Sequence, residues 1–259
     1  MKIVVKGEEI TITRQQERFL RLLYKFRYVN TQELAKVLGI RSDTTYQVLK
    51  ALVDKGLVIK VYKKEYRIDR KPAYYYLSNT GVTTVRKLLD VPESVVHALY
   101  KQGSDDFIAQ CQTTLATYNL IKDHLPPGSY IFSRTEINQD SAFPKYRPDL
   151  YIRTPGNQEV IIYIMTSKPN YIINKRIDEI ITHSEDEGWD GDYPIIAVFV
   201  KDSLTQKNIL YKTNIKLASM GMGEDELTVL FTDINSLRSV SKKIWRNSFE
   251  PKKPKLLLS

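Results

Sequence analysis

Two glycines and the residues around them divide the start of the chain into three short helical segments. In the first segment the apolar side chains recur at i, i+3, i+4 and i+7, which is the repeat of one helix face. Asn30 and Ser42 are each a helix-start signal. Gly39 and Gly56 stand where a helix C-terminus favours glycine. Helices are therefore predicted over residues 15–28, from Gln32 to Leu38 and from Ser42 to about Lys55.

A basic hairpin follows the third predicted helix. Leu57 to Tyr62 and Ala73 to Leu77 are predicted to be strands, and the tip between them, residues 63–71, is rich in Lys and Arg. We interpret the tyrosines at 74, 75 and 76 as packing residues of this hairpin rather than as a platform for bases. Three helices and a basic hairpin resemble the winged helix-turn-helix class. In this resemblance Thr31–Gly39 is the second helix and turn, and Asp43–Val58 is the recognition helix running into the wing.

A recognition helix of this class enters the major groove with its N-terminal residues toward the base edges. Gln47 has the amide that pairs with adenine, and Lys50 or Arg41 can reach guanine or a phosphate. Cations of the wing are expected to neutralise phosphates, which makes binding dependent on salt. The predicted DNA-binding residues are Arg41, Ser42, Thr44, Tyr46, Gln47, Lys50, Lys63, Lys64, Tyr66, Arg67, Arg70 and Lys71.

The charge of the chain is unevenly distributed. The 259 residues have a formal net charge of +9, but residues 1–90 carry +10, residues 91–237 carry −7 and residues 238–259 carry +6. A concentrated basic segment is the electrostatic footprint expected for nucleic acid. The main alternative for the first segment is a winged helix that docks a protein.

The middle of the chain has the element order of a nuclease-like domain. A helix from Ser104 to His124, three strands, a helix and a strand are predicted in the order αβββαβ, followed by an extra αβα ending in a helix from Asp233 to Trp245. With Asp149 on one hairpin strand and Lys168 after the next, this order resembles the PD-(D/E)xK, or restriction-endonuclease-like, fold. That active site needs a second acid to hold a divalent metal, and Thr166 stands in its place. Glu159 lies on the opposite strand face, and nothing in the sequence positions Glu136.

A winged helix followed by a degenerate nuclease-like domain resembles the replication-relaxation family of plasmids, phages and integrative elements. The resemblance is carried by Tyr74–Gly81, by the helix around Phe107 to Ile121, and by Tyr146-Arg147-Pro148-Asp149. It implies an accessory DNA-binding role in plasmid replication, conjugative transfer or their regulation.

Other enzyme classes lack their motifs. The sequence contains no phosphate-binding loop and no nucleophile elbow, and its three His are too far apart for a relaxase metal site. Cys111 is expected to be a small core residue, and His183 part of a solvated acidic helix end. No apolar run is long enough to span a membrane, and the N-terminus does not resemble a signal peptide, so a cytoplasmic location is predicted.

The combined fold prediction is α+β and α/β, with a winged helix-turn-helix in residues 1–90, the nuclease-like domain in 91–240 and a basic flexible tail in 241–259. The predicted function is sequence-specific binding of double-stranded DNA, with no enzymatic activity, no metal and no cofactor, and with Asp149 and Lys168 as vestiges of a catalytic site. Further expected partners are a second copy of the chain, relaxase or replication proteins, but no membrane. A metal-dependent nuclease and a ligand-responsive transcriptional regulator remain alternatives.

Overall fold

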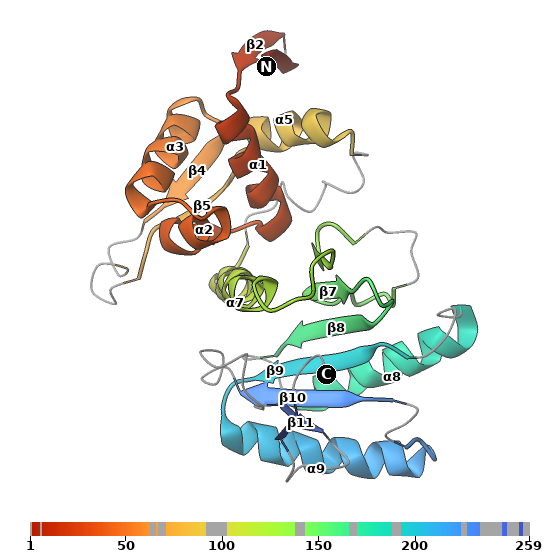
Figure 1. The fold of residues 1–259 in the computed structure, drawn as a ribbon. Coiled ribbons are helices and arrows are strands. Elements are labelled where there is room, and N and C mark those ends of the chain that lie inside the picture. Colours follow the sequence, from red (N-terminus) through yellow and green to blue (C-terminus); the bar gives the residue numbers. More distant parts are fainter. Residues whose placement is uncertain are drawn as a thin grey trace. The chain divides into compact units, whose positions relative to one another are not determined.

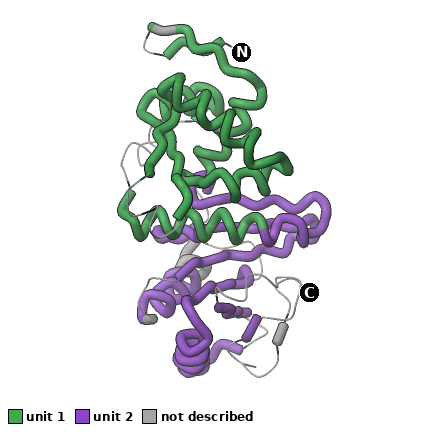
Figure 2. Tube along the Cα trace, turned by 90° about the vertical axis from the view of Figure 1, so that its left-hand side faces the viewer, with its two compact units in different colours: residues 1–119 green, residues 120–259 purple. Residues whose placement is uncertain are grey.

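The computed structural model contains two compact units, Met1–Asn119 and Leu120–Ser259, coloured separately in Figure 2. The division falls inside helix α7 (Asp105–Lys122), whereas the sequence placed a domain boundary at residue 90. The structure describes residues 2–5, 7–62, 66, 71–91, 103–137, 143–165, 170–187, 193–223, 227–233, 245–247 and 254–255.

The first unit has the helices and strands of a winged helix (Figure 1). Its three-stranded antiparallel sheet has the order β3-β5-β4, and α1 and α3 pack together beside it. Phe19, Leu23, Leu49 and Leu52 from these two helices are fully buried. The elements are α1 (Arg14–Phe26), β3 (Val29–Asn30), α2 (Thr31–Leu38), α3 (Ser42–Asp54), β4 (Val58–Val61) and β5 (Tyr74–Leu77).

Local signals in the sequence explain where the two helices of the helix-turn-helix begin and end. The Asn30 side chain accepts a hydrogen bond of 2.9 Å from the Glu33 N–H and so caps α2, as predicted. Gly39 has φ of 64°, the left-handed conformation that ends the helix. The cap of α3 differs from the prediction, because Arg41 is the N-cap residue without a side-chain hydrogen bond and Ser42 is already helical.

Besides the short strand β3, two parts of the first unit were not predicted. One is the hairpin of β1 (Lys2–Val5) and β2 (Glu8–Thr11). The other is helix α5 (Asn79–Leu89), whose first residues fall in the Tyr74–Gly81 stretch that carries the family resemblance. Ser78 caps α5 by accepting from the Gly81 N–H at 3.0 Å. A Cβ on Gly81 would lie 2.0 Å from the backbone oxygen of Leu57, so only glycine fits there.

Helix α7 supplies the last part of the first unit. Ser104 accepts a hydrogen bond from the Phe107 N–H, which confirms the predicted helix start. Ile108 and Cys111 pack with Tyr28 in one buried cluster, and Cys111 is therefore a core residue, as expected. The sequence analysis assigned this helix to the acidic domain, but its residues up to Asn119 cluster with the winged helix.

The second unit contains a seven-stranded sheet in the order β12-β11-β10-β9-β8-β7-β6 (Figure 1). Strands β6, β7 and β8 pair antiparallel, whereas β8, β9 and β10 pair parallel through the crossover helices α8 and α9. The αβββαβ order was thus predicted correctly. The elements are β6 (Tyr130–Ser133), β7 (Leu150–Arg153), β8 (Glu159–Ile164), α8 (Asn170–Glu187), β9 (Ile195–Val200), α9 (Ser203–Ser219) and β10 (Val229–Asp233).

Both crossover helices bury an apolar side against the same face of this sheet. Ile177 of α8 and Ile209 of α9 belong to one cluster with Ile161, Val198 and Phe231 from three neighbouring strands. Because side chains alternate along a strand, the residues between these point to the opposite face. Those residues, such as Ile162 and Phe199, are also fully buried.

The C-terminal residues correct two predictions. Asp233 ends β10 and Trp245 begins β11 (Trp245–Asn247), so neither lies in the predicted helix, whose interior falls outside the described residues. Strand β12 (Pro254–Lys255) pairs antiparallel with β11. The Trp245 side chain is fully buried with its ring 5.0 Å from that of Phe199. These residues are therefore part of the sheet and not a flexible tail.

Candidate nucleic-acid interface

Helix α3 presents one exposed polar face. Asp43, Tyr46, Gln47 and Lys50 follow each other at i, i+3, i+4 and i+7 and are all exposed, whereas Thr45, Leu49 and Leu52 are buried. Ser42 and Thr44 are exposed at the N-terminus of the helix. The structure thus places the predicted α3 residues together on a surface that a partner can reach.

An ion pair at the start of α3 was not predicted. The Arg41 guanidinium lies 3.6 Å from the Asp43 carboxylate, and both side chains are strongly exposed. An ion pair as exposed as this contributes about 0–1 kcal/mol, so a phosphate can replace the carboxylate as the partner of Arg41.

Lys60 belongs to the same surface, although the sequence analysis did not include it. Its ammonium nitrogen lies 5.6 Å from the centre of the Tyr46 ring, so this lysine of β4 lies beside the exposed face of α3. The charge of Lys60 identifies it as a candidate surface residue, but the sequence does not show which helix it faces. Only the packing of α3 against β4 brings Lys60 and Tyr46 together.

The wing is described only in part. Lys63, Lys64, Arg67 and Arg70 lie outside the described residues, and Lys71 is exposed.

Tyr66 has a different place from the one predicted. Its side chain is 7% exposed, and its ring packs edge-on against the rings of Tyr62 and Tyr74. We therefore interpret Tyr66 as a support of the wing rather than as a DNA contact.

The tyrosines of β5 pack inside the first unit. Tyr75 is buried, and Tyr74 and Tyr76 pack against the cluster of Tyr28, Ile108 and Cys111. Burial raises the pKa of Tyr28, Tyr74 and Tyr75 above the ordinary value, because the phenolate is poorly solvated there. The interpretation of these tyrosines as packing residues is confirmed.

Polar side chains of α7 hold the start of the helix-turn-helix in place. Gln112 donates to the backbone oxygen of Tyr28 at 2.7 Å and accepts from the side-chain amide of Asn30, the cap of α2. Asn119 donates to the backbone oxygen of Glu33 at 3.0 Å and to its carboxylate at 2.8 Å. The sequence gave no sign of these two residues, because they lie more than 80 positions from their partners.

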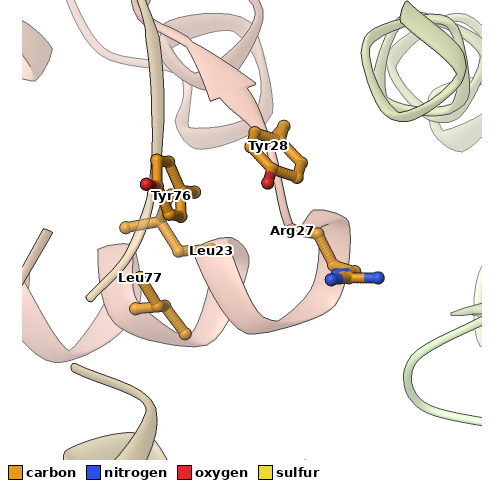
Figure 3. A pocket seen from close by; sticks show the side chains of 5 residues that line it. All are labelled: Leu23, Arg27, Tyr28, Tyr76 and Leu77. Carbon is orange, nitrogen blue, oxygen red and sulfur yellow. The ribbon is translucent and has the colours of Figure 1, made fainter. Parts of the chain in front are cut away.

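A shallow pocket lies between α1 and β5 (Figure 3). Leu23, Arg27, Tyr28, Tyr76 and Leu77 line it, with the Tyr28 and Tyr76 rings 5.1 Å apart. Its volume of 210 Å³ includes space open to solvent. Pockets for small ligands usually measure about 300–1,000 Å³, so this pocket gives no support to a ligand-responsive regulator.

The structure describes only one of the two residues that were predicted to be vestiges of a nuclease site. Lys168 and Thr166 lie outside the described residues. Asp149 is 4% exposed and uses both carboxylate oxygens: one lies 3.0 Å from the Arg134 guanidinium, and the other accepts from the Ile164 N–H at 2.7 Å. Burial disfavours the Arg134 cation, but Asp149 and the nearby tyrosines outweigh this effect and raise its pKa.

Neither of the other acids considered for this site lies free beside Asp149. The Glu136 carboxylate accepts from the Ser133 N–H at 2.9 Å, and that of Glu159 accepts from the Tyr151 hydroxyl at 2.5 Å. Within the described ranges, no group of three or more His, Cys, Asp or Glu side chains is arranged to hold a metal ion. No helix described here is long and apolar enough to cross a membrane.

The family comparison agrees with the resemblance found in the sequence. A family model described as replication-relaxation matches residues 20–116. We call residues 20–116, which this model matches, the replication-relaxation segment. This segment starts in α1 and ends in α7. It therefore contains the helix-turn-helix, the wing and the hydrogen bond from the Gln112 side chain to the Tyr28 backbone that joins α7 to them. No curated protein shows significant sequence similarity to the chain.

Some solved structures resemble parts of the chain. A mutant of MarR from E. coli complexed with operator DNA is 23% identical over 44% of this chain and 76% of its own, with a TM-score of 0.28. The adhesin competence repressor AdcR from Streptococcus pyogenes is 19% identical over 38% of this chain and 73% of its own, with a TM-score of 0.25. TrmBL2, an archaeal chromatin protein, is 15% identical over 86% of this chain and 72% of its own, with a TM-score of 0.23. Scores this low do not establish a shared fold, so the winged-helix description above rests on the contacts within the replication-relaxation segment.

Proposed function

We propose that the replication-relaxation segment binds double-stranded DNA in a sequence-specific manner through α3 and the wing. The observation that carries this proposal is the single exposed face of α3 with Tyr46, Gln47 and Lys50, extended by Lys60 from β4. An amide reads adenine and a lysine reads guanine or a phosphate, so this face combines base readout with backbone neutralisation. The net charge of +10 on residues 1–90 favours the same partner.

The test separates base readout from general attraction. A preferred duplex is selected from random DNA, and the affinities for this duplex and for an unrelated one are compared. We expect the double variant Gln47→Ala Lys50→Ala to bind both duplexes equally. A matched control is Arg18→Ala Arg21→Ala on the exposed side of α1, which should keep the discrimination. Unchanged discrimination in the α3 variant would overturn the proposal.

We further propose that the second unit is a restriction-endonuclease-like domain without nuclease activity. The contacts of Asp149 support this, since the guanidinium of Arg134 and a backbone N–H already take the oxygens that a metal would need. The experiment incubates the full chain and supercoiled plasmid with Mg²⁺ or Mn²⁺. Nicking that disappears in Asp149→Ala or Lys168→Ala would show a nuclease and overturn this part of the proposal.

The biological setting that we propose is a bacterial mobile element, where the protein acts as a cytoplasmic accessory factor in plasmid replication, conjugative transfer or their regulation. The family description of residues 20–116 supports this setting. The second unit would then dock a second copy of the chain or a relaxase or replication protein. Binding of the full chain to a replication or transfer origin, measured by footprinting, tests the setting, and protection of neither origin would contradict it.

A further inference from the structure

The outer face of helix α9 carries several large apolar side chains, although it lies on the surface. Leu204 is 69% exposed, Tyr211 70% and Ile215 53%. Together with Asn208 and Ala218, these residues form what we call the α9 stripe, Leu204-Asn208-Tyr211-Ile215-Ala218. The side of α9 that faces the sheet is made by other residues, such as Ile209, Thr213 and Leu217, which are buried. The stripe is therefore not needed to fold the helix against the sheet.

The spacing of the α9 stripe is that of one seam of a coiled coil. Successive members are 4, 3, 4 and 3 residues apart, which places Leu204 and Tyr211 at d positions and Asn208 and Ile215 at a positions. An exposed surface helix usually carries charged residues at such positions, as α1 does with Arg14, Arg18 and Arg21. The heptad spacing predicts that a second helix packs along α9.

The charges beside the stripe decide which kind of helix fits. Lys207 and Lys212 flank the stripe at the g and e positions and are exposed. Helix α9 contains no Asp or Glu, although residues 91–237 as a whole carry a net charge of −7. If two copies of α9 paired, lysines would face lysines in either orientation, and like charges at an interface are unfavourable.

We infer that the α9 stripe is a docking surface for an amphipathic helix of another protein that has apolar a and d positions flanked by Glu or Asp. This inference deepens the partner-docking role proposed for the second unit and rests on it. It names the surface, and it excludes a second copy of the chain as the occupant. The seam is short, about two heptads, so the expected complex is weak and reversible.

The test uses two synthetic peptides of about three heptads with Leu at a and d, one with Glu and the other with Lys at e and g. Fluorescence anisotropy measures the binding of each peptide to the full chain. We expect the Glu peptide to bind and the Lys peptide not to bind. Ile215→Glu and Tyr211→Glu should each weaken binding at least about tenfold, because they place a like charge in the seam.

The matched control is Tyr171→Glu on α8, since Tyr171 is also 70% exposed but lies outside the stripe. It should leave binding of the Glu peptide unchanged. The double variant Lys207→Glu Lys212→Glu should reverse the preference, so that the Lys peptide binds. An equal loss in the Tyr171 and Tyr211 variants, or no binding of the Glu peptide to the wild-type chain, would overturn the inference.

Two further measurements keep this inference separate from the proposed function. Sedimentation of the wild-type chain that shows a dimer abolished by Tyr211→Glu would assign the stripe to a second copy and overturn the inference. Binding to the selected DNA duplex should be the same for the wild-type chain and the Tyr211 variant. If the wild-type chain failed to discriminate between duplexes, only the proposed DNA recognition would be contradicted. If the Glu peptide failed to bind, only the docking surface would be contradicted.

Discussion

The polar residues of α3 considered for a site are exposed in the first unit, whereas Asp149 of the second unit is buried. In the first unit, Gln47 and Lys50 are exposed on α3, and Lys60 lies beside them against the Tyr46 ring. In the second unit, Asp149 is buried and both of its carboxylate oxygens have partners within the protein. A buried carboxylate whose oxygens are both paired is not available to an external ligand, whereas an exposed side chain is. The comparison therefore supports the recognition role proposed for the first unit and a structural role for Asp149 in the second.

The largest expected effect comes from breaking the pair in the second unit. Asp149→Ala would leave the Arg134 guanidinium without its carboxylate and the Ile164 N–H without its acceptor. Removing one partner of a buried ion pair costs about 3–5 kcal/mol, and we expect about 3 kcal/mol because Arg134 is partly exposed. Hydrogen exchange of the full chain should show faster exchange in β7 and β8 but not in α1 or α3.

A second variant distinguishes loss of the Arg134–Asp149 ion pair from loss of side-chain packing. Arg134→Met Asp149→Leu replaces both charges with apolar groups, and such replacements are often close to neutral. This variant should regain part of the lost protection. If the single and double variants were equally destabilised, the ion pair would not be the reason.

An intermediate effect is expected where α7 supports the helix-turn-helix. Gln112→Ala Asn119→Ala removes hydrogen bonds to Tyr28, Asn30 and Glu33 and should destabilise the first unit by about 1–3 kcal/mol. Hydrogen exchange in α2 should accelerate, while β9 and β10 stay unchanged. The control Gln110→Ala lies on the same helix at a partly exposed position and should have a smaller effect. No change in α2 would show that the first unit holds its helix-turn-helix without α7.

Much of the fold could be predicted because local signals determine it. Asn30 and Gly39 mark the two ends of α2. The unbroken apolar run of β9 identifies a buried parallel strand. Helix α5 was missed because Gly81 near its start is typical of a turn, whereas the glycine is needed for the close approach of Leu57. Strand β12 was missed because Pro and Lys are typical of a loop, although both are tolerated in an edge strand.

The candidate site was predictable only where exposure follows from helix periodicity. The polar face of α3 could be read from the spacing of its buried residues. Contacts between elements could not be predicted, because no sequence pattern indicates the Lys60–Tyr46 contact or the Arg134–Asp149 pair. Arg134 and Asp149 meet because they flank the paired strands β6 and β7, and this register is a property of the folded sheet.

A smaller effect is expected from Lys60, the lysine of β4 that lies beside the exposed face of α3. Lys60→Ala should weaken binding to the selected and the unrelated duplex alike, because a lysine on a phosphate carries no sequence information. The slope of log affinity against log salt concentration should fall by about 1. Lys87→Ala on α5 is the control, because this lysine donates to the backbone of Val4. A salt slope equal to that of the wild-type chain would remove Lys60 from the interface.

The smallest expected effect concerns the acid on the recognition face. Asp43 is an exposed carboxylate at the N-terminal end of this face, and it pairs with Arg41 at 3.6 Å. Asp43→Asn should release Arg41 toward the DNA and raise affinity a few-fold, while changing stability by less than about 1 kcal/mol. Titration of both duplexes at two salt concentrations measures the change. A gain on both duplexes identifies Asp43 as a general electrostatic barrier. A loss confined to the selected duplex would mean that its carboxylate accepts a hydrogen bond from a cytosine amino group.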